Sequence, residues 1–364
     1  MKWKNSRFYF QLFFRLLQAT FKSKDIRRDF ERFPNKELNS RLSEGRSINK
    51  LLQYREIINK IKSIKGSFKK LNKFADVFNM FDDNYSKYIF IELMSAFILG
   101  FHKVKLLLNN DTYWRVKAKV KNMIKGKKFI TADGWILNFY DLNKIKIPLL
   151  LYNTSLGILN TFITEQYCYK HEKMIMAEES DIVIDAGGCW GDTSLYFANK
   201  VKDSGYVYSF EFIPSNINIM KKNLNLNPYL KNIIQIIEKP LWKISDCEIY
   251  YVDKGPSSHV SSTFLSSFSG NVKTITLDDF VEKNHISKID FIKMDIEGSE
   301  YDVLIGAKET ISKFKPKLAI SLYHNIDHFY KIPKFIDSLN LNYRFYLDHF
   351  TTHSEETILF AFSK

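Results

Sequence analysis

From about residue 180 to the end of the chain, short apolar runs alternate with longer segments that are apolar on one face only. The short runs predict buried strands, and the longer segments predict amphipathic helices. The expected strands cover residues 181–185, 205–211, 232–237, 247–252, 288–294 and 317–323, and the expected helices cover 193–201, 215–226, 301–314 and 330–339. Such alternation predicts an α/β fold with a doubly wound sheet. Two further apolar runs, 342–347 and 356–362, suit a closing antiparallel strand pair.

The first third of the chain has a helical pattern instead. Residues 3–22 carry aromatic and aliphatic side chains with basic residues between them, and residues 85–109 form an apolar stretch interrupted by Glu92 and His102. Both patterns predict helices, and His102 is expected to be structural. Residues 24–74 hold many charges and few apolar runs, which predicts exposed helices or a partly mobile segment.

The pattern changes near residue 128. Two strand-like runs around an Asp-Gly turn predict a β-hairpin over residues 128–140. Residues 148–170 then lead to the strand at 181 and are expected to form its lid or platform. We therefore divide the chain into a basic helical accessory region, 1–127, and a second domain, 128–364.

The net charge of +14 is unevenly distributed along the chain. Residues 1–130 hold 30 Lys and Arg against 11 Asp and Glu, which is +19, and residues 131–364 hold 24 against 29, which is −5. Codon use in an A+T-rich genome is one explanation, and contact with a polyanion or an anionic membrane surface is the other. The helix over 3–22 could lie in a membrane interface, although packing on the protein's own body is the commoner use of such a stripe. We expect no nucleic-acid partner and leave a homo-oligomer open.

Three observations bear on the compartment. The three cysteines show no paired spacing, so a disulfide framework is excluded. No stretch reaches 18 uninterrupted apolar residues, and the first 22 residues lack a small-residue cleavage site. These features predict a cytoplasmic protein, peripheral to the inner face of the membrane if its basic region binds there.

The stretch DIVIDAGGCWGDT, residues 181–193, reads as a strand, a glycine turn and the start of a helix. This device brings backbone N–H groups against a ligand, and a turn that serves only packing is the alternative. A dinucleotide fingerprint would place glycine where Ala186 stands, and the carboxylate of Asp185 would repel a pyrophosphate, so a nicotinamide oxidoreductase is disfavoured. The spacing instead resembles motif I of class I S-adenosylmethionine-dependent methyltransferases, whose cofactor carries an ammonium and a sulfonium. The expected cofactor residues here are Asp185, Ala186, Gly187, Gly188, Gly191, Asp192 and Thr193.

Glu211 lies 26 residues past Asp185, at the carboxyl end of the next expected strand. Open α/β sheets bind ligands at that edge, and an acid there can accept hydrogen bonds from both ribose hydroxyls of an adenosine. The alternative is a solvated glutamate at a strand end. We assign Glu211, together with the adjacent Phe212, to the cofactor site.

Two further blocks, TLDDF at 276–280 and KMDIEGSE at 293–300, complete a recognisable pattern with IDAGGCWGDTSLYFA, YSFEFIPSN, KPKLAISLYH and the terminal EETILFAF. Together they resemble the FkbM family of methyltransferases over roughly residues 128–364. The resemblance implies a class I (Rossmann-like) methyltransferase fold, S-adenosylmethionine as donor and transfer to a hydroxyl oxygen. Members of that family act on sugars of surface polysaccharides, on glycolipids and on secondary metabolites. The implied substrate is a sugar hydroxyl of a surface glycan or its precursor.

Methyl transfer from a sulfonium is an in-line displacement that needs an aligned hydroxyl and a group to remove its proton. Asp295 and Glu297 follow one expected strand, and His324 follows the next. Because histidine titrates near neutrality, we predict that His324 is the base and that Asp295 positions the substrate or the base. Gly298 permits a turn that could aim Glu297 back to the site, although an acid at a helix N-terminus is the competing explanation.

Two alternatives stay open for the chemistry and for the function. A divalent ion held by Asp295, Glu297 and His324 would activate the hydroxyl directly, but no metal site is predicted. His349 and Glu356 are reserve candidates near the last strand pair. The remaining hypothesis for the function is a non-catalytic scaffold of the same fold at the membrane. A scaffold would not need a cofactor pocket, so the cofactor residues argue against it.

Overall fold

The computed structural model describes residues 5–21, 68–101, 103–261 and 268–364. The chain divides into two compact units, Met1–Asn110 with Thr351–Glu355 (the helical unit) and Asp111–Phe350 with Glu356–Lys364 (the sheet unit). The domain boundary expected at residue 127 stays a prediction. His102 and most of the charged segment 24–74 lie outside the described residues.

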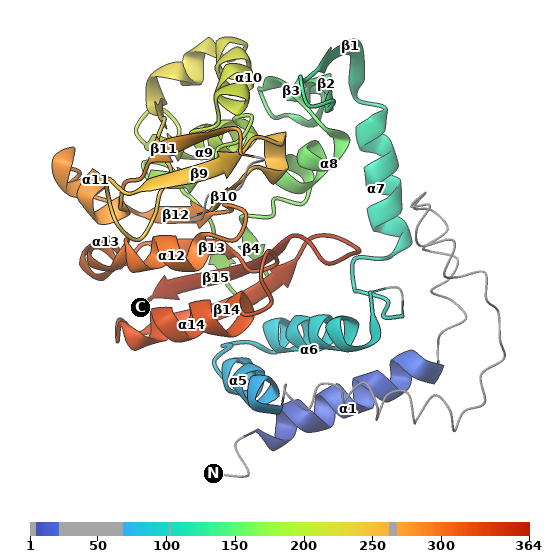
Figure 1. Cartoon of the computed structure of the whole chain (residues 1–364). Coiled ribbons are helices and arrows are strands. Elements are labelled where there is room, and N and C mark those ends of the chain that lie inside the picture. Colours follow the sequence, from blue (N-terminus) through green and yellow to red (C-terminus); the bar gives the residue numbers. More distant parts are fainter. Residues whose placement is uncertain (1–4, 22–67, 102, 262–267) are drawn as a thin grey trace. The chain divides into compact units, whose positions relative to one another are not determined.

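The described part of the helical unit contains helices α1 (Ser6–Phe21), α5 (Phe68–Phe78) and α6 (Asn84–Leu99) (Figure 1). Phe8 of α1 packs against Phe78 of α5 and Phe90 of α6, with ring centroids 5.5 and 6.2 Å apart. Arg15 donates to both carboxylate oxygens of the buried Glu92, at 2.7 Å for Nη2 and Oε2. The helix predicted over residues 3–22 is therefore confirmed, and the charge that interrupts the apolar pattern of α6 is paired.

Helix α6 is shorter than the predicted span of 85–109. It ends before Gly100, whose φ of 99° lies in the region that favours glycine and whose N–H donates to the carbonyl of Ala96. Within the described ranges, no helix has the length and the apolar character needed to cross a membrane.

The sheet unit begins with helix α7 (Asp111–Lys121) and a three-stranded antiparallel sheet of β1 (Ile124–Ile130), β2 (Ile136–Asp141) and β3 (Leu150–Asn153). The predicted hairpin is confirmed by the pairing of β1 with β2, in which Lys128 stands opposite Asn138. Residues 148–170 form β3, helix α8 (Ser155–Ile158), helix η3 (Leu159–Ile163) and strand β4 (Tyr169–Lys170), which pairs with β5 (Met174–Ile175).

A seven-stranded sheet in the order β14-β15-β13-β12-β6-β7-β8 forms the centre of the sheet unit. Strands β8, β7, β6, β12 and β13 run parallel, and β15 is antiparallel to both of its neighbours. The strands are β6 (Ile182–Ala186), β7 (Tyr206–Phe210), β8 (Ile234–Ile237), β12 (Phe291–Met294), β13 (Lys317–Ser321), β14 (Tyr343–His349) and β15 (Thr357–Ser363). The predicted doubly wound sheet and its closing antiparallel pair are confirmed.

Helices α9 (Asp192–Val201), α10 (Pro214–Asn225), α11 (Leu277–Lys283) and α14 (His328–Ser338) connect these strands, together with the 3₁₀ helix η4 (Pro228–Ile233). A smaller sheet in the order β10-β9-β11 is inserted after β8, from β9 (Glu248–Val252), β10 (His259–Ser261) and β11 (Gly270–Lys273), with the 3₁₀ helix η5 (Gly255–Ser257) between β9 and β10. The strand predicted over 232–237 begins two residues late because η4 occupies its start.

The single helix predicted over 301–314 is two helices, α12 (Glu300–Ile305) and α13 (Lys308–Phe314). The carboxylate of Asp278 accepts hydrogen bonds from the N–H groups of Glu309 and Thr310, at 3.1 and 2.7 Å. A side chain from α11 thus satisfies N–H groups that a continuous helix would have bonded internally. Gly306 ends α12, and this long-range cap fixes the start of α13.

Strand β6 lies where the order of the central sheet reverses, because the chain passes from it to β7 and β8 on one side and later to β12 and β13 on the other. Asp185 near the end of β6 is level with Ser209 on β7 and with Lys293 on β12. Open α/β sheets bind ligands at the carboxyl edge beside such a reversal. The fold therefore places the ends of β6, β7 and β12 around one candidate site.

Candidate active site

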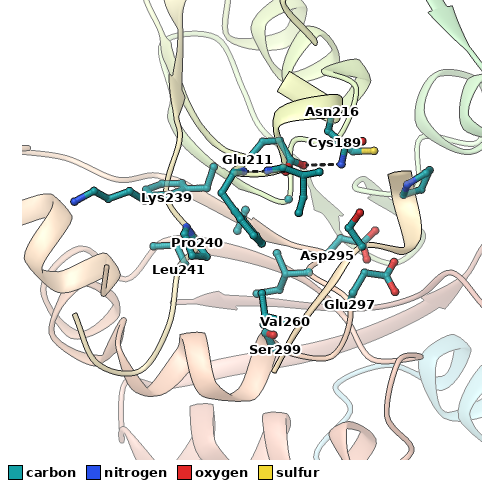
Figure 2. Close-up of a pocket in the computed structure, with 18 of the residues that line it drawn as sticks. Cys189, Glu211, Asn216, Lys239, Pro240, Leu241, Val260, Asp295, Glu297 and Ser299 are labelled. Atoms are coloured by element: carbon teal, nitrogen blue, oxygen red, sulfur yellow. Dashed lines mark hydrogen bonds between the residues drawn. The ribbon is translucent and has the colours of Figure 1, made fainter. Parts of the chain in front are cut away.

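A pocket of about 630 Å³, open to solvent, lies at the carboxyl ends of β6, β7 and β12. Its lining comes from the turn after β6, residues 210–213 after β7, residues 239–241 after β8, parts of segment 255–260, and residues 295–299 after β12. Figure 2 shows Glu211 beside Cys189 and Asn216, with Asp295 and Glu297 on another wall.

Glu211 is held rigidly in this pocket. Its Oε1 accepts hydrogen bonds from the N–H groups of Phe212 and Ile213, both at 2.8 Å, and its Oε2 lies 3.4 Å from the amide nitrogen of Asn216. Burial raises the pKa of Glu211 to about 7, although these donors oppose the shift. A buried carboxylate that still has acceptor capacity is suited to a pair of hydroxyl groups.

The turn after β6 brings two backbone segments into contact. Gly187 has a φ of 89°, and a Cβ there would lie 2.0 Å from the carbonyl oxygen of Asp295. Any other residue would therefore push β6 and β12 apart at the pocket floor. The glycine at this position is therefore needed for packing between the two strands, and the same turn also lines the pocket.

Of the residues predicted to bind the cofactor, Ala186, Gly187, Glu211 and Phe212 line the pocket. The other five, Asp185, Gly188, Gly191, Asp192 and Thr193, are not among its described lining residues. Asp192 begins α9 and accepts a hydrogen bond from Thr161 at 3.0 Å, and Thr193 donates to Asp185. Direct cofactor contact by these five stays a prediction.

Asp185 was expected to turn its carboxylate towards a cationic cofactor, but in the structure it faces the protein interior. Its side chain is fully buried, and its Oδ2 accepts from the hydroxyls of Thr193 and Ser194 at 2.8 and 2.7 Å. The ammonium of Lys293 lies 3.1 Å from its Oδ1 and donates to the carbonyl of Gly187 at 2.6 Å. Burial lowers the Lys293 pKa, but Asp185 and Asp295 outweigh it and raise that pKa. The cation that this carboxylate needs is a lysine of the chain itself.

Asp295 was expected at the mouth of the site, and it does line the pocket, with 17% of its side chain exposed. The hydroxyl of Tyr167 donates to its Oδ2 at 2.7 Å, and that of Tyr323 donates to its Oδ1 at 3.0 Å. Burial, followed by the charge of Asp295, raises both tyrosine pKa values well above their ordinary value. The two phenols therefore remain donors that hold the carboxylate in one orientation.

The loop after Asp295 is shaped by a buried acid. Glu300 accepts from the N–H of Ile296 at 3.0 Å and from the N–H of Gly298 at 3.4 Å. Glu297 has a φ of 53°, a left-handed conformation that is uncommon for a residue other than glycine. Glu297 lines the pocket with 33% of its side chain exposed, as the predicted turn at Gly298 required.

His324 lies behind these acids. Its Nδ1 is 2.8 Å from Oε1 of Glu300, and its Nε2 is 3.6 Å from Oδ1 of Asp295 and 3.5 Å from Oε1 of Glu297. Burial lowers the His324 pKa, but the neighbouring Glu297, Glu300 and Asp295 raise it to about 11. Three carboxylates around one imidazole favour its protonated form, which argues against the predicted role of His324 as the base.

The two reserve candidates are not among the described lining residues of the pocket, although the charge of Glu356 acts on Tyr167 and Tyr323. The Nδ1 of His349 is 2.8 Å from the hydroxyl of Thr357. Sequence reasoning missed Tyr167, Lys293 and Glu300. The last two stand inside the block KMDIEGSE, so their place in that block was an available signal, whereas nothing local marked Tyr167.

A comparison with models of protein families gives a match within the sheet unit. Residues 175–345 match the family model described as methyltransferase FkbM domain. This range contains β6 to β13 and every described residue of the pocket lining.

Two individual proteins are similar to the chain. The 2-O-methyltransferase NoeI of Sinorhizobium fredii (strain NBRC 101917 / NGR234) is 40% identical over 60 residues, which is 16% of this chain and 25% of that protein. The crystal structure of methyltransferase FkbM from Methylobacillus flagellatus KT matches with a TM-score of 0.51 and 18% identity, over 81% of this chain and 59% of that one. The structural similarity shows the class I methyltransferase fold, and both matches cover less than two thirds of the other protein.

Proposed function

Because the chain carries a methyltransferase FkbM domain, we propose that it transfers a methyl group from S-adenosylmethionine to a hydroxyl oxygen of a sugar, in a surface glycan or its precursor. The name of the similar 2-O-methyltransferase supports oxygen as the acceptor atom. The observation that carries the proposal is the position of Glu211, a buried carboxylate with free acceptor capacity at the end of β7, in one pocket with Asp295 and Glu297.

The pocket residues fit this cofactor. Glu211 would accept hydrogen bonds from the ribose hydroxyls, with Phe212 beside the adenosine, and the turn at Ala186 and Gly187 would approach the amino-acid end. Asp185 would act indirectly, since its hydroxyl and lysine partners fix the turn and the start of α9. When bound, S-adenosylmethionine supplies an electrophilic methyl group on a sulfonium.

Asp295, Glu297 and His324 remain the proposed catalytic set, with altered roles. An imidazolium at His324 cannot accept a proton, so the carboxylates of Asp295 and Glu297 would accept the hydrogen bond of the acceptor hydroxyl and orient its oxygen. The hydroxyl proton becomes acidic as the new C–O bond forms, and it then passes to a carboxylate while the C–S electron pair stays on sulfur. Several acceptor oxygens near the mouth also suit a substrate rich in hydroxyl groups.

Calorimetry tests the cofactor assignment. We expect the full chain to bind S-adenosylhomocysteine and Glu211→Gln to bind it about 10- to 100-fold more weakly, because a hydrogen bond to a charged group contributes about 1.5–3 kcal/mol. Ile244→Ser, a change at an exposed side chain outside the described lining, should leave the affinity unchanged. If S-adenosylhomocysteine does not bind at millimolar concentration, the non-catalytic scaffold is favoured. If NADH binds instead, an oxidoreductase is favoured.

Transfer itself is measured by incubating the chain with labelled S-adenosylmethionine and either nucleotide-linked or lipid-linked sugars. Label in a sugar ether supports the proposed substrate class. Label that appears only in protein, nucleic acid or a nitrogen position would contradict it.

We also propose that the helical unit contacts an anionic membrane from the cytoplasmic side. Phe10, Phe13 and Phe14 of α1 are 71, 56 and 53% exposed, and α1 lies in the basic part of the chain. Exposed aromatic residues on a helix with nearby basic residues suit a membrane interface.

Deleting α1 would be a poor test of this contact, because Phe8, Leu12 and Leu16 are part of the helical core. Phe10→Ser/Phe13→Ser/Phe14→Ser keeps that core and should lose salt-sensitive sedimentation with anionic vesicles. Ile244→Ser, at a similarly exposed apolar position, is the matched control. Equal sedimentation of both variants and the wild type would rule out this contact.

A further inference from the structure

At the wall of the pocket, the imidazole of His324 faces the carboxylates of Asp295 and Glu297. The Nε2 of His324 lies 3.6 Å from Oδ1 of Asp295 and 3.5 Å from Oε1 of Glu297. The His324 side chain is 8% exposed, and its Nε2 is buried without a hydrogen-bond partner. A buried ring nitrogen that lies beyond the ordinary hydrogen-bond distance from both carboxylates that it faces requires an explanation.

The other ring nitrogen of His324 is already engaged. Its Nδ1 lies 2.8 Å from Oε1 of Glu300, an acid that is completely buried. Because Glu300 also accepts the N–H groups of Ile296 and Gly298, its Oε1 is fixed as an acceptor. Nδ1 is therefore the donor in this pair, and the remaining nitrogen, Nε2, points between Asp295 and Glu297.

Without an ion, a proton on Nε2 balances the charge of the two carboxylates that it faces. A divalent cation between the three atoms would take the place of that proton and bind the neutral ring together with both acids. A carboxylate that orients a histidine from behind is also the usual arrangement at metal centres, where the ligating ring donates its other N–H to an acid. Asp295 is held by Tyr167 and Tyr323 in the same manner.

We propose that Asp295, Glu297 and His324 bind a divalent cation, with Glu300 as the residue that orients His324. Among the described residues, Asp295, Glu300 and His324 form a group whose candidate ligand atoms lie within 4.8 Å of one another. We assign Glu297 in place of Glu300 because Oε1 of Glu300 is occupied by Nδ1 of His324 and by two backbone N–H groups.

The ligand chemistry indicates the class of ion. Two carboxylate oxygens with one imidazole nitrogen suit Mn²⁺ or Mg²⁺ rather than a thiolate-seeking metal. Neighbouring ligand atoms around such an ion lie roughly 3 Å apart, since the bonds are about 2.1 Å long. The partly exposed Glu297 can make the small inward movement that this needs.

The role of the ion rests on the proposed function. Three protein ligands leave coordination positions open towards the pocket, where an acceptor hydroxyl could bind and have its pKa lowered. The proton of that hydroxyl passes to solvent, the oxygen–carbon bond forms, and the carbon–sulfur bond breaks with its electron pair left on sulfur. The imidazole then acts as a ligand and never has to be the base.

Titration of the chelator-treated full chain with Mn²⁺, followed by electron paramagnetic resonance and calorimetry, tests the site. We expect one Mn²⁺ per chain, with nitrogen coupling in electron spin-echo modulation from the imidazole. Glu297→Gln should weaken Mn²⁺ binding at least about tenfold, and an unchanged melting temperature shows that the variant is folded.

Glu211→Gln is the matched control, because it alters a carboxylate of the same pocket that is not near the proposed ion. It should weaken S-adenosylhomocysteine binding and leave Mn²⁺ binding unchanged. If the wild-type chain binds S-adenosylhomocysteine but not millimolar Mn²⁺, the metal site is overturned and the proposed function stands. If it binds Mn²⁺ but not S-adenosylhomocysteine, the proposed function is overturned and the metal site stands. Mn²⁺ binding that Glu297→Gln does not alter would also overturn it.

Discussion

Asp185 and Asp295 occupy comparable places at the ends of two neighbouring strands, β6 and β12, yet the structure treats them differently. Asp185 is fully buried and has the ammonium of Lys293 and two hydroxyls as partners. Asp295 is partly exposed in the pocket and has two phenols and a distant histidine nitrogen around it. One acid is neutralised by the chain, and the other keeps capacity for a ligand.

The difference shows how a strand-end acid is assigned a role. Burying a carboxylate is costly unless a cation and hydrogen-bond donors come with it, so the paired Asp185 serves the architecture of the turn. Glu211, at the end of β7, is an intermediate case because it is buried with backbone donors but without a cation. Its raised pKa, about 7, reflects that lack.

The largest effect is expected from removing the built-in cation. Lys293→Met should lower the free energy of unfolding by about 3–5 kcal/mol, because it leaves the buried Asp185 without its counter-charge. Lys243→Met is the matched control, since the ion pair of Lys243 with Asp302 is exposed and should contribute about 1 kcal/mol or less. Urea unfolding of both variants measures the difference, and equal losses would refute a structural role for the Lys293 pair.

Neutralising each strand-end acid in turn tests the comparison directly. Asp185→Asn should cost about 3 kcal/mol of unfolding free energy because Lys293 then remains buried and unpaired. Asp295→Asn should cost about 1 kcal/mol or less, because that side chain is partly exposed and the asparagine can still accept from one of the two tyrosine hydroxyls and donate to the other. Thermal and urea unfolding of the two variants side by side provide the measurement, and a larger cost for Asp295→Asn would reverse our assignment of roles.

Glu211 adds a pH dependence. Its pKa is raised from 4.5 to about 7 in the folded chain, so its contribution to stability is fully present below pH 4.5 and is lost as the pH rises through 7. Ribose hydroxyls donate to the ionised form, so affinity for S-adenosylhomocysteine should instead rise about tenfold from pH 6 to pH 8.

Calorimetry and unfolding at several pH values check both trends for Glu211. In Glu211→Gln, neither the free energy of unfolding nor the affinity should show the change with pH that the Glu211 carboxyl causes in the wild type. Affinity that falls with rising pH in the wild type would contradict the assignment of Glu211 to the ribose.

The smallest effect concerns the phenols around Asp295. Tyr323→Phe removes one hydrogen bond of 3.0 Å and should lower the free energy of unfolding by about 1 kcal/mol. Tyr343→Phe, which removes a hydrogen bond to the carbonyl of Pro316 away from the pocket, is the control for losing a buried phenol. If the metal site exists, Tyr323→Phe should in addition weaken Mn²⁺ binding about tenfold, and Tyr343→Phe should not.

Much of the fold could be predicted because its signals are local. The strand at 181–185, the helix at 193–201 and the closing pair at the chain end follow from apolar periodicity and glycine positions, and the structure confirms them. The break between α12 and α13 was signalled by Gly306, which ends α12, whereas the carboxylate that caps α13 comes from Asp278 on another helix and could not be predicted. The early end of α6 was signalled by Gly100, which the apolar run on either side concealed.

For the candidate site, too, some features follow from local sequence and others depend on the tertiary structure. The sequence by itself determined that Asp185, Glu211, Asp295 and His324 would stand at the ends of neighbouring strands, since strand spacing and the glycine turn are local properties. It also carried the blocks that resemble the FkbM methyltransferases, and residues 175–345 match that family model.

Only the tertiary structure decided which of these groups are satisfied and which remain available. Lys293 reaches Asp185 because parallel pairing of β6 with β12 sets the two side by side, and His324 meets Glu297 and Glu300 through the turn at Gly298. The charge state of a carboxylate or an imidazole depends on burial and on partners that are distant in sequence. The local sequence pattern therefore located the acids along the chain, and three-dimensional packing decided which of them are neutralised by the protein and which can bind a ligand.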